Sequence, residues 1–307
     1  MKAMVLEQYN TNLKMKDVSE PTPGPRDLIL KVHKCGICGT DLKIVFGKLP
    51  QIISLPHIPG HEIVGEIVDK GKDVEKYSRG DMGVVYFYIS CGDCEMCRTG
   101  RENICFNIKR LGFELNGGYA EYVRIPAYSF CPVEDSSVST SELAVLPDAI
   151  ATPYHSLKSL AECRAGQKIL IVGAGGFGLH AVQIASMLGT QTAVADLREE
   201  SLLLAKDYGA EVTINPLKED PCEIVMSWTK GKGVDVVLEG VGREKTFSWS
   251  HNSHYGITIT LIDSAALPCT LKAFSTSSSL NLWVIRISLL TFPEEMRFSA
   301  SSVSFGQ

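Results

Sequence analysis

Short apolar runs alternate with amphipathic stretches in the second half of the chain. Residues 168–172 form a β-branched run, a glycine-rich turn follows, and residues 179–188 carry apolar side chains at helical spacing up to Gly189. This order predicts a strand, a turn and a helix. Further strands are predicted at 192–195, 212–214 and 234–239, and a further helix at 201–208. Such alternation indicates a parallel sheet with helices packed on it.

The pattern weakens after residue 248. Thirteen of the 60 residues at 248–307 are serine and two are glycine, and residues 249–254 show no helical apolar spacing. Strands are still indicated at 256–262 and 280–290, and a helix start at 293–296. We hypothesise that a frameshift or truncation has damaged this part of the coding sequence; the alternative is a genuine divergent tail. Resequencing the source DNA tests this, because an intact frame with matching peptide masses would overturn it.

Composition indicates a class of protein and a compartment. With 45% hydrophobic and 21% charged residues, the 307-residue chain resembles a globular protein long enough for two domains. A net charge of −5 argues against binding to nucleic acid or to an anionic membrane. No apolar run approaches the roughly 18 residues of a membrane span, and Glu7 comes too early for a signal-peptide core. We therefore expect a cytoplasmic protein.

Four of the ten cysteines are clustered. An even spread would place about 0.5 cysteines in any window of 15 residues, yet one window holds Cys91, Cys94, Cys97 and Cys105. Two-residue gaps let the chain wrap a tetrahedral ion, and four thiolates close the shell of zinc and leave no position for substrate. The spacing and a reducing compartment favour a structural zinc site. An iron–sulfur cluster, two disulfides and four unrelated thiols are the alternatives.

Further metal-binding residue types lie in two distant segments. Cys38 is in the run CGICGTD at 35–41, and His61 is in the run PGHE at 59–62. Neither is diagnostic alone, because a lone cysteine is usually a small buried hydrophobe and a lone histidine is more often a hydrogen-bonded core residue. Their order and their context change this interpretation.

Taken together, the motifs resemble those of the zinc-dependent medium-chain alcohol dehydrogenases, which include alcohol, polyol and threonine dehydrogenases. The matching segments are GICGTD at 36–41, GHE at 60–62, the four-cysteine lobe, GGYAEY at 117–122 and the glycine-rich turn that starts at Gly173. They are collinear from about residue 1 to about residue 245, and several motifs in order are much more specific than any one of them.

The resemblance implies a two-domain α/β fold. Residues 1–150 would form a GroES-like, mostly β catalytic domain with two zincs, and residues 151–307 a Rossmann domain with a doubly wound parallel sheet. The active site is expected in the cleft between them. The segment that returns to the catalytic domain in the family is missing from the pattern after residue 248. A homo-oligomer, a dimer or a tetramer, is expected if this region is intact.

By this resemblance, Cys38 and His61 are ligands of the catalytic zinc and the third ligand falls at Asp148. Glu62 is either a fourth ligand or a partner that orients His61 or an arginine. A thiolate, an imidazole and a carboxylate leave one exchangeable position, where an alcohol oxygen binds and loses its proton near neutral pH. The alternative for Asp148 is a helix N-cap or a turn residue, because Pro147 precedes it.

Thr40 lies where members of the family keep a hydroxyl that passes the substrate proton outward. The alternative is that Thr40 caps the helix predicted to begin near Asp41, and the two roles are compatible. Many members then have a histidine five residues after the zinc cysteine, whereas this chain has Lys43 there. Water or the cofactor ribose would have to carry the proton.

The turn after residues 168–172 fits a dinucleotide. Gly173 makes the tight turn, Gly175 lets the backbone approach the pyrophosphate, and Gly178 permits close packing of helix on strand. Asp196 ends the next strand, where a carboxylate accepts the ribose hydroxyls of NAD and repels a 2′-phosphate. The alternative for Asp196 is an ordinary turn or N-cap residue.

NAD is therefore preferred over NADP, with the reservation that Arg198 could meet a phosphate. The predicted cofactor-binding residues are Gly173, Gly175, Gly176, Phe177, Gly178, Asp196, Arg198 and Val241. The resemblance implies reversible oxidation of a small alcohol, secondary or a polyol, to the carbonyl, with hydride passing to nicotinamide. The rival hypotheses are an NADPH-dependent carbonyl reductase and a zinc- and NAD-binding protein without catalysis.

Overall fold

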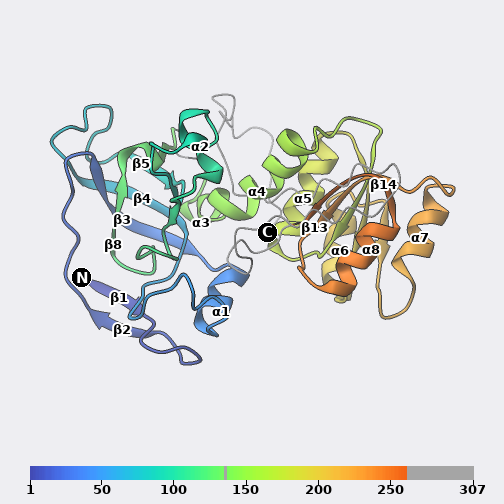
Figure 1. The fold of residues 1–307 in the computed structure, drawn as a ribbon, viewed down its shortest axis with the longest axis horizontal. Coiled ribbons are helices and arrows are strands. Elements are labelled where there is room, and N and C mark those ends of the chain that lie inside the picture. The colour runs from blue at the N-terminus through green and yellow to red at the C-terminus, as the bar shows by residue number, and fades with distance from the viewer. Residues whose placement is uncertain (135–136, 261–307) are drawn as a thin grey trace. The chain divides into compact units, whose positions relative to one another are not determined.

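The computed structural model describes residues 1–134 and 137–260. The chain divides into two compact units, with the boundary between Asp148 and Ala149, and each is built on its own five-stranded sheet (Figure 1). Among the described residues, no helix combines the length and the apolar character that a membrane crossing requires.

The sheet of the first unit is antiparallel throughout. Its strands, in spatial order, are β8 (Tyr122–Pro126), β3 (Asp27–Gly36), β4 (Glu62–Lys70), β5 (Met82–Val85) and β9 (Phe130–Pro132). The two long strands β3 and β4 contribute fully buried side chains such as Leu30 and Ile63. Because Gly36 at the end of β3 pairs with Glu62 at the start of β4, the segments that hold Cys38 and His61 begin side by side.

Smaller elements surround this sheet. Two hairpins and three helices are β1 (Lys2–Val5) with β2 (Lys14–Asp17), β6 (Tyr88–Ile89) with β7 (Lys109–Arg110), α1 (Gly39–Val45), α2 (Glu95–Arg98) and α3 (Thr140–Ala144). Short 3₁₀ turns occur at Glu102–Ile104 and Ala127–Ser129, and a π-helical turn at Leu146–Ile150. The four-cysteine lobe is the excursion between β6 and β7, whose pairing closes its base.

The sheet of the second unit is parallel throughout. Its strands, in spatial order, are β12 (Val212–Ile214), β11 (Gln191–Ala195), β10 (Lys168–Val172), β13 (Val234–Glu239) and β14 (His254–Thr260). The helices are α4 (Ala151–Tyr154), a π-helical stretch (His155–Leu160), α5 (Gly176–Met187), α6 (Glu199–Asp207), α7 (Pro221–Trp228) and α8 (Glu244–Asn252). The predicted parallel sheet and its strands at 168–172, 212–214 and 234–239 are confirmed.

The strand order reverses direction at β10. The chain runs outward from β10 through β11 to β12, then returns to β13 on the other side of β10. Ligands of open α/β sheets bind at the carboxyl ends of the strands where the order reverses. The turn after β10 and the loop after β13 therefore form the expected ligand-binding edge of this unit.

Residues 249–254 show no helical apolar spacing in the sequence, yet regular structure continues past residue 248. Residues 244–252 form helix α8, and β14 follows it directly. Trp249 packs against the core of the sheet, which explains how a helix with few apolar residues is held in place. The strand start at 256 is confirmed as part of β14, whereas the elements expected at 280–290 and 293–296 and the damaged-tail hypothesis fall outside the described residues.

Candidate functional site

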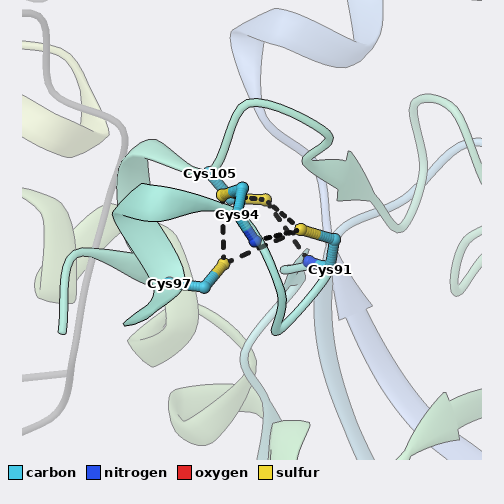
Figure 2. A group of neighbouring side chains, drawn as sticks. All are labelled: Cys91, Cys94, Cys97 and Cys105. Atoms are coloured by element: carbon cyan, nitrogen blue, oxygen red, sulfur yellow. Dashed lines mark hydrogen bonds between the residues drawn. The ribbon is translucent and has the colours of Figure 1, made fainter. Parts of the chain in front are cut away.

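The four sulfur atoms of the cysteine lobe gather in one place (Figure 2). Their closer separations run from 3.4 to 3.9 Å. Zinc–sulfur bonds of about 2.3 Å in a tetrahedron place the sulfurs about 3.8 Å apart. All four thiols are free, so the two-disulfide alternative does not describe this structure. The lobe therefore has the geometry of a four-thiolate zinc site.

Backbone N–H groups point at these sulfur atoms. Cys94 N donates to Cys91 Sγ at 3.4 Å, and Cys91 N and Asn107 N donate to Cys105 Sγ at 3.3 and 3.4 Å. Backbone hydrogen bonds from Asp93 and Cys94 lower the pKa of Cys91 to about 6, whereas burial raises the pKa of Cys105 to about 12. Zinc binds thiolates, and the N–H groups stabilise that form. Four thiolates around one ion leave no place for substrate, which is typical of a structural site.

A second cluster brings together residues from three segments of the first unit. The candidate ligand atoms of Cys38, His61, Glu62 and Asp148 all lie within 4.8 Å of one another. Asp148 Oδ2 lies 3.6 Å from Cys38 Sγ and 3.4 Å from His61 Nε2. A soft thiolate, an imidazole and carboxylates at this spacing form a donor set that suits zinc.

Local structure explains how these side chains converge. Cys38 is the extended N-cap residue of α1, and Glu62 is the first residue of β4. A side chain on Gly36 would collide with the Glu62 carboxylate, so the glycine makes room for it. Asp148 lies inside the π-helical turn, a feature often found at functional sites.

His61 is oriented by a residue that was not among the predicted site residues. Its Nδ1 faces Asp41 Oδ1 at 3.4 Å, and within the described residues neither atom has a closer hydrogen-bond partner. The other oxygen, Asp41 Oδ2, accepts hydrogen bonds from Cys38 N at 2.9 Å and from the Tyr119 hydroxyl at 2.8 Å. This arrangement turns His61 Nε2 toward Asp148. The three-residue spacing from Cys38 to Asp41, that of a capping box, was the signal available in the sequence.

The electrostatics of the cluster favour a cation. Burial lowers the pKa of His61, but hydrogen bonds to Asp148, Asp41 and Cys38 outweigh burial and raise it well above its ordinary value. Burial, together with the charge of Asp148, raises the pKa of Glu62 to about 7. The carboxylates and the thiol therefore surround one buried histidine with acidic groups. This environment favours a positive charge at the site, either a proton on His61 or a metal ion bound to it.

Two aromatic rings pack against the histidine. The rings of Phe87 and Phe113 have their centroids 5.0 and 5.1 Å from that of His61, and both are nearly fully buried. Arg110 lies 4.5 Å over the Phe113 ring and pairs with Glu114 at 2.7 Å. The predicted site included none of these residues, because aromatic side chains in a sequence are more often plain core.

The capping alternatives proposed for two site residues are wrong, whereas the turn alternative for Asp148 agrees with the structure. Cys38, not Thr40, is the N-cap of α1, and Thr40 is the second residue of that helix. Asp148 lies within the π-helical turn and is not a helix N-cap. Thr40 is half-buried and lies one helical turn before Lys43. The capping explanation therefore does not account for either residue.

The predicted dinucleotide site is a strand, a glycine turn and a helix start. Gly173 has a φ of +98°, which favours glycine, and Gly175 is the N-cap of α5. A side chain on Gly178 would collide with the Gly173 carbonyl oxygen, whereas one on Gly175 or Gly176 would meet no atom within 4 Å. The helix N-terminus around Gly176 and Phe177 is therefore open to an anionic group.

Asp196 lies at the end of β11, beside this turn. Its Oδ2 accepts a hydrogen bond from Ala174 N at 2.7 Å, and its Oδ1 accepts one from Arg198 N at 2.8 Å. The second bond is the turn interaction given above as the alternative role of Asp196. The Arg198 side chain is mostly exposed and lies 3.6 Å from the same carboxylate. Val241 lies in the loop after β13 and is 40% exposed.

Comparisons with known proteins agree with this geometry. Residues 24–135 match the family model "Alcohol dehydrogenase GroES-like domain", and residues 176–253 match "Zinc-binding dehydrogenase". An alcohol dehydrogenase of Geobacillus stearothermophilus is 35% identical over 82% of this chain and 74% of the relative. An NAD-dependent alcohol dehydrogenase of Sulfolobus acidocaldarius is 36% identical over 81% of this chain and 73% of the relative.

Solved structures give the same result. The alcohol dehydrogenase of Aeropyrum pernix superposes with a TM-score of 0.78 at 32% identity, over 85% of this chain and 78% of that one. The predicted combination of a GroES-like domain with a Rossmann-like parallel-sheet domain is confirmed. The two clusters of metal-ligating side chains agree with these relatives, and the chain is an oxidoreductase that belongs to the zinc-dependent medium-chain alcohol dehydrogenase family.

Proposed function

We propose that this protein oxidises a secondary alcohol or a polyol reversibly to the carbonyl compound and transfers hydride to NAD. The observation that carries the proposal is the convergence of Cys38, His61, Glu62 and Asp148, whose ligand atoms lie within 4.8 Å of one another. A set of thiolate, imidazole and carboxylate donors is typical of a catalytic zinc site, in which one position stays open for substrate.

Each group has a distinct task in this proposal. Cys38, His61 and Asp148 would hold the catalytic zinc, with Glu62 either a fourth ligand or a neighbour that balances its charge. When bound, zinc supplies a Lewis acid for the substrate oxygen and NAD supplies the hydride acceptor. Asp41 keeps a proton on His61 Nδ1, so that Nε2 is free to bind metal.

Thr40 is proposed to take the proton of the alcohol and to pass it outward. Its hydroxyl lies on α1, two residues after Cys38, and its capping alternative has been excluded. Lys43 occupies the position where a histidine would extend the relay in many family members. Water or the cofactor ribose then carries the proton away.

The preference for NAD is supported by Asp196. Hydrogen bonds from Ala174 N and Arg198 N hold this carboxylate at the end of β11, close to the glycine turn. A fixed negative charge there repels a 2′-phosphate and accepts ribose hydroxyls. The relative from Sulfolobus acidocaldarius is named NAD-dependent, which agrees with this choice. Tighter binding of NADPH than of NADH would contradict the role of Asp196 and favour a carbonyl reductase.

We further propose how the domains, the cofactor site and the subunits are organised. Residues 1–150 serve as the zinc-binding catalytic domain and residues 151–307 as the NAD-binding domain. The cofactor residues are those of the β10 turn together with Asp196, Arg198 and Val241. A cytoplasmic location and a homo-oligomer complete the proposal, with a small alcohol or carbonyl compound as the partner.

Elemental analysis of the purified chain tests both metal sites before any substrate is chosen. We expect about two zincs per chain, of which Cys91→Ser removes one and Asp148→Asn removes the other. With two zincs present, NADH formation with secondary alcohols and polyols then tests catalysis. A single zinc that is lost with Cys91→Ser and kept with Cys38→Ser would contradict the catalytic site and favour a non-catalytic binding protein.

A further inference from the structure

A fully buried carboxylate lies at the end of β13. Glu239 is 0% exposed and is the last residue of that strand. A buried carboxylate costs free energy unless its oxygens are well hydrogen-bonded, and an apolar side chain would serve better if packing were the only purpose. The hydrogen-bond partners of the Glu239 carboxylate therefore indicate its role.

The Glu239 carboxylate binds the loop that follows it. Oε1 accepts hydrogen bonds from Val241 N at 2.9 Å, Gly242 N at 3.0 Å and the Thr246 hydroxyl at 2.8 Å, and Oε2 accepts a second from Gly242 N at 3.1 Å. Hydrogen bonds to a charged acceptor are stronger than neutral ones. This one side chain thus fixes both the loop backbone and the first turn of α8.

The fixed loop packs directly on the glycine-rich turn. Gly240 N donates to Val172 O at 3.0 Å, which continues the pairing of β13 with β10. A side-chain carbon on Gly173 would lie 2.8 Å from Val241 Cγ2, and one on Gly240 would lie 3.0 Å from the Phe177 ring. Val241 therefore forms one wall of the open edge where the strand order reverses, and its 40% exposure leaves part of its side chain available to a ligand.

We propose that Glu239 is a positioning residue for the dinucleotide, because it holds Val241 and Gly242 in place against the Gly173–Gly178 turn. This inference rests on the proposed function, which places NAD at that edge. Glu239 acts through the loop: a wall that is rigid before binding loses less conformational entropy when the cofactor arrives.

The test compares two substitutions of Thr246, which lies beyond the cofactor wall. Thr246→Val removes the hydroxyl and keeps the shape, whereas Thr246→Ser keeps the hydroxyl. Isothermal titration with NAD on the full chain should show affinity about tenfold weaker for Thr246→Val and near wild-type affinity for Thr246→Ser. Glu239→Gln should weaken NAD binding at least as much. Zinc content should stay unchanged in all three variants, because both zinc clusters lie in the other unit.

The melting temperature separates positioning from simple support. If Thr246→Val lowers the melting temperature but binds NAD like the wild-type protein at a temperature well below unfolding, the inference is wrong and the carboxylate is only structural. If the wild-type protein binds no NAD, the proposed function fails and the inference fails with it. If Glu239→Gln does not fold, the comparison of the two Thr246 variants decides the question.

Discussion

At the scale of single residues, two carboxylates with the same burial behave in opposite ways. Asp41 and Glu62 are each 3% exposed. Burial raises the pKa of Asp41, but hydrogen bonds from His61, Cys38 N and Tyr119 outweigh it and hold the pKa below its ordinary value. Among the described residues no such set of donors surrounds Glu62, and burial together with the charge of Asp148 raises its pKa to about 7. Asp41 therefore stays ionised and can accept a hydrogen bond from His61. The protonation of Glu62, in contrast, depends on the charges of the neighbouring groups in the cluster.

The Tyr119 hydroxyl should matter for metal affinity. Tyr119→Phe removes one of the donors that fix Asp41, so His61 is held less firmly. Losing a group that orients a metal ligand typically costs 10- to 100-fold in affinity, and we expect about tenfold here. Competition with a chromophoric chelator measures it.

The matched control is Tyr128→Phe. The Tyr128 hydroxyl donates to Ser90 O at 3.2 Å and its side chain is largely exposed. This variant should keep wild-type affinity for both zincs. Equal affinities in the Tyr119 and Tyr128 variants would show that the hydroxyl on Asp41 has no part in zinc binding.

His57 should make the protein less stable in acid. Burial lowers its pKa below the ordinary 6.5, and Nε2 bonds Gly112 O at 2.9 Å. Below about pH 6.5 the unfolded chain takes up a proton that the folded chain resists, so stability falls as pH falls. His57→Gln keeps a donor and cannot titrate, so its melting temperature should fall less between about pH 7.5 and about 5.5.

His33→Gln is the control for this comparison. His33 is largely exposed and lies 3.3 Å from Glu66. Both substitutions replace one imidazole by an amide, so a difference between the two variants is due to the burial of His57. An unchanged pH dependence in His57→Gln would rule out His57 as a source of acid sensitivity.

The sequence predicted the members of both clusters but not what supports them. Cys38, His61 and Asp148 were named because their residue types and order match a known family. Asp41 and Tyr119 were quoted within motifs without a role, because their contact depends on the pairing of β3 with β4 and on a loop 78 residues away. Hydrogen bonds between distant segments leave no periodic signal in a sequence.

At the scale of elements, the turn between β10 and α5 depends on how closely they approach. Gly178 lies where an added methyl group would collide with the Gly173 carbonyl oxygen, whereas Gly176, in the same helix turn, has free space around its Cα. The two glycines therefore have different purposes. Gly178 allows helix–strand packing, and Gly176 leaves the helix start uncovered.

Replacing each glycine by alanine should separate these purposes. Gly178→Ala should lower the free energy of unfolding by about 1–3 kcal/mol, because backbone must move to relieve the collision. Gly176→Ala should change it by less than about 0.5 kcal/mol. Urea denaturation of both variants measures the difference, and equal stabilities would contradict the close approach described here.

Element prediction succeeded where β-branched residues lie between turn residues and failed where contacts with distant segments decide the structure. Strands β10, β12 and β13 are bounded as predicted because each is rich in β-branched residues and lies between glycine, proline or other turn residues. Helix α8 has the sequence EKTFSWSHN, with little apolar periodicity, and was not expected. It is held by Trp249 on the sheet core and by the Thr246 hydroxyl on Glu239. Both contacts form only in the folded sheet, so the sequence pattern of the helix does not predict them.

At the scale of the whole molecule, only the first of the two units contains candidate metal clusters among the described residues. Both candidate metal clusters belong to the unit that ends at Asp148, and the parallel sheet belongs to the unit that begins at Ala149. All three tryptophans of the sequence follow residue 149, at positions 228, 249 and 283. Tryptophan fluorescence therefore reports only on the part of the chain that follows residue 149.

Chelation should destabilise the units unequally. Removal of zinc leaves the sulfur atoms of the cysteine lobe without the ion that joins them, so the first unit should unfold at a lower temperature. The tryptophan-detected transition should shift by less than the transition seen by calorimetry. A shift of equal size in both signals would indicate that the chain unfolds as one cooperative block.

The four-thiolate geometry of the cysteine lobe also predicts the order in which the two clusters would lose zinc during storage. An ion enclosed by four thiolates can leave only after the lobe opens, whereas an ion with an open position exchanges its ligands one at a time. Zinc should therefore escape from the Cys38 cluster long before it escapes from the lobe. If the proposed function is right, a stored sample would pass through a folded but inactive form, and brief incubation with zinc would restore activity without refolding.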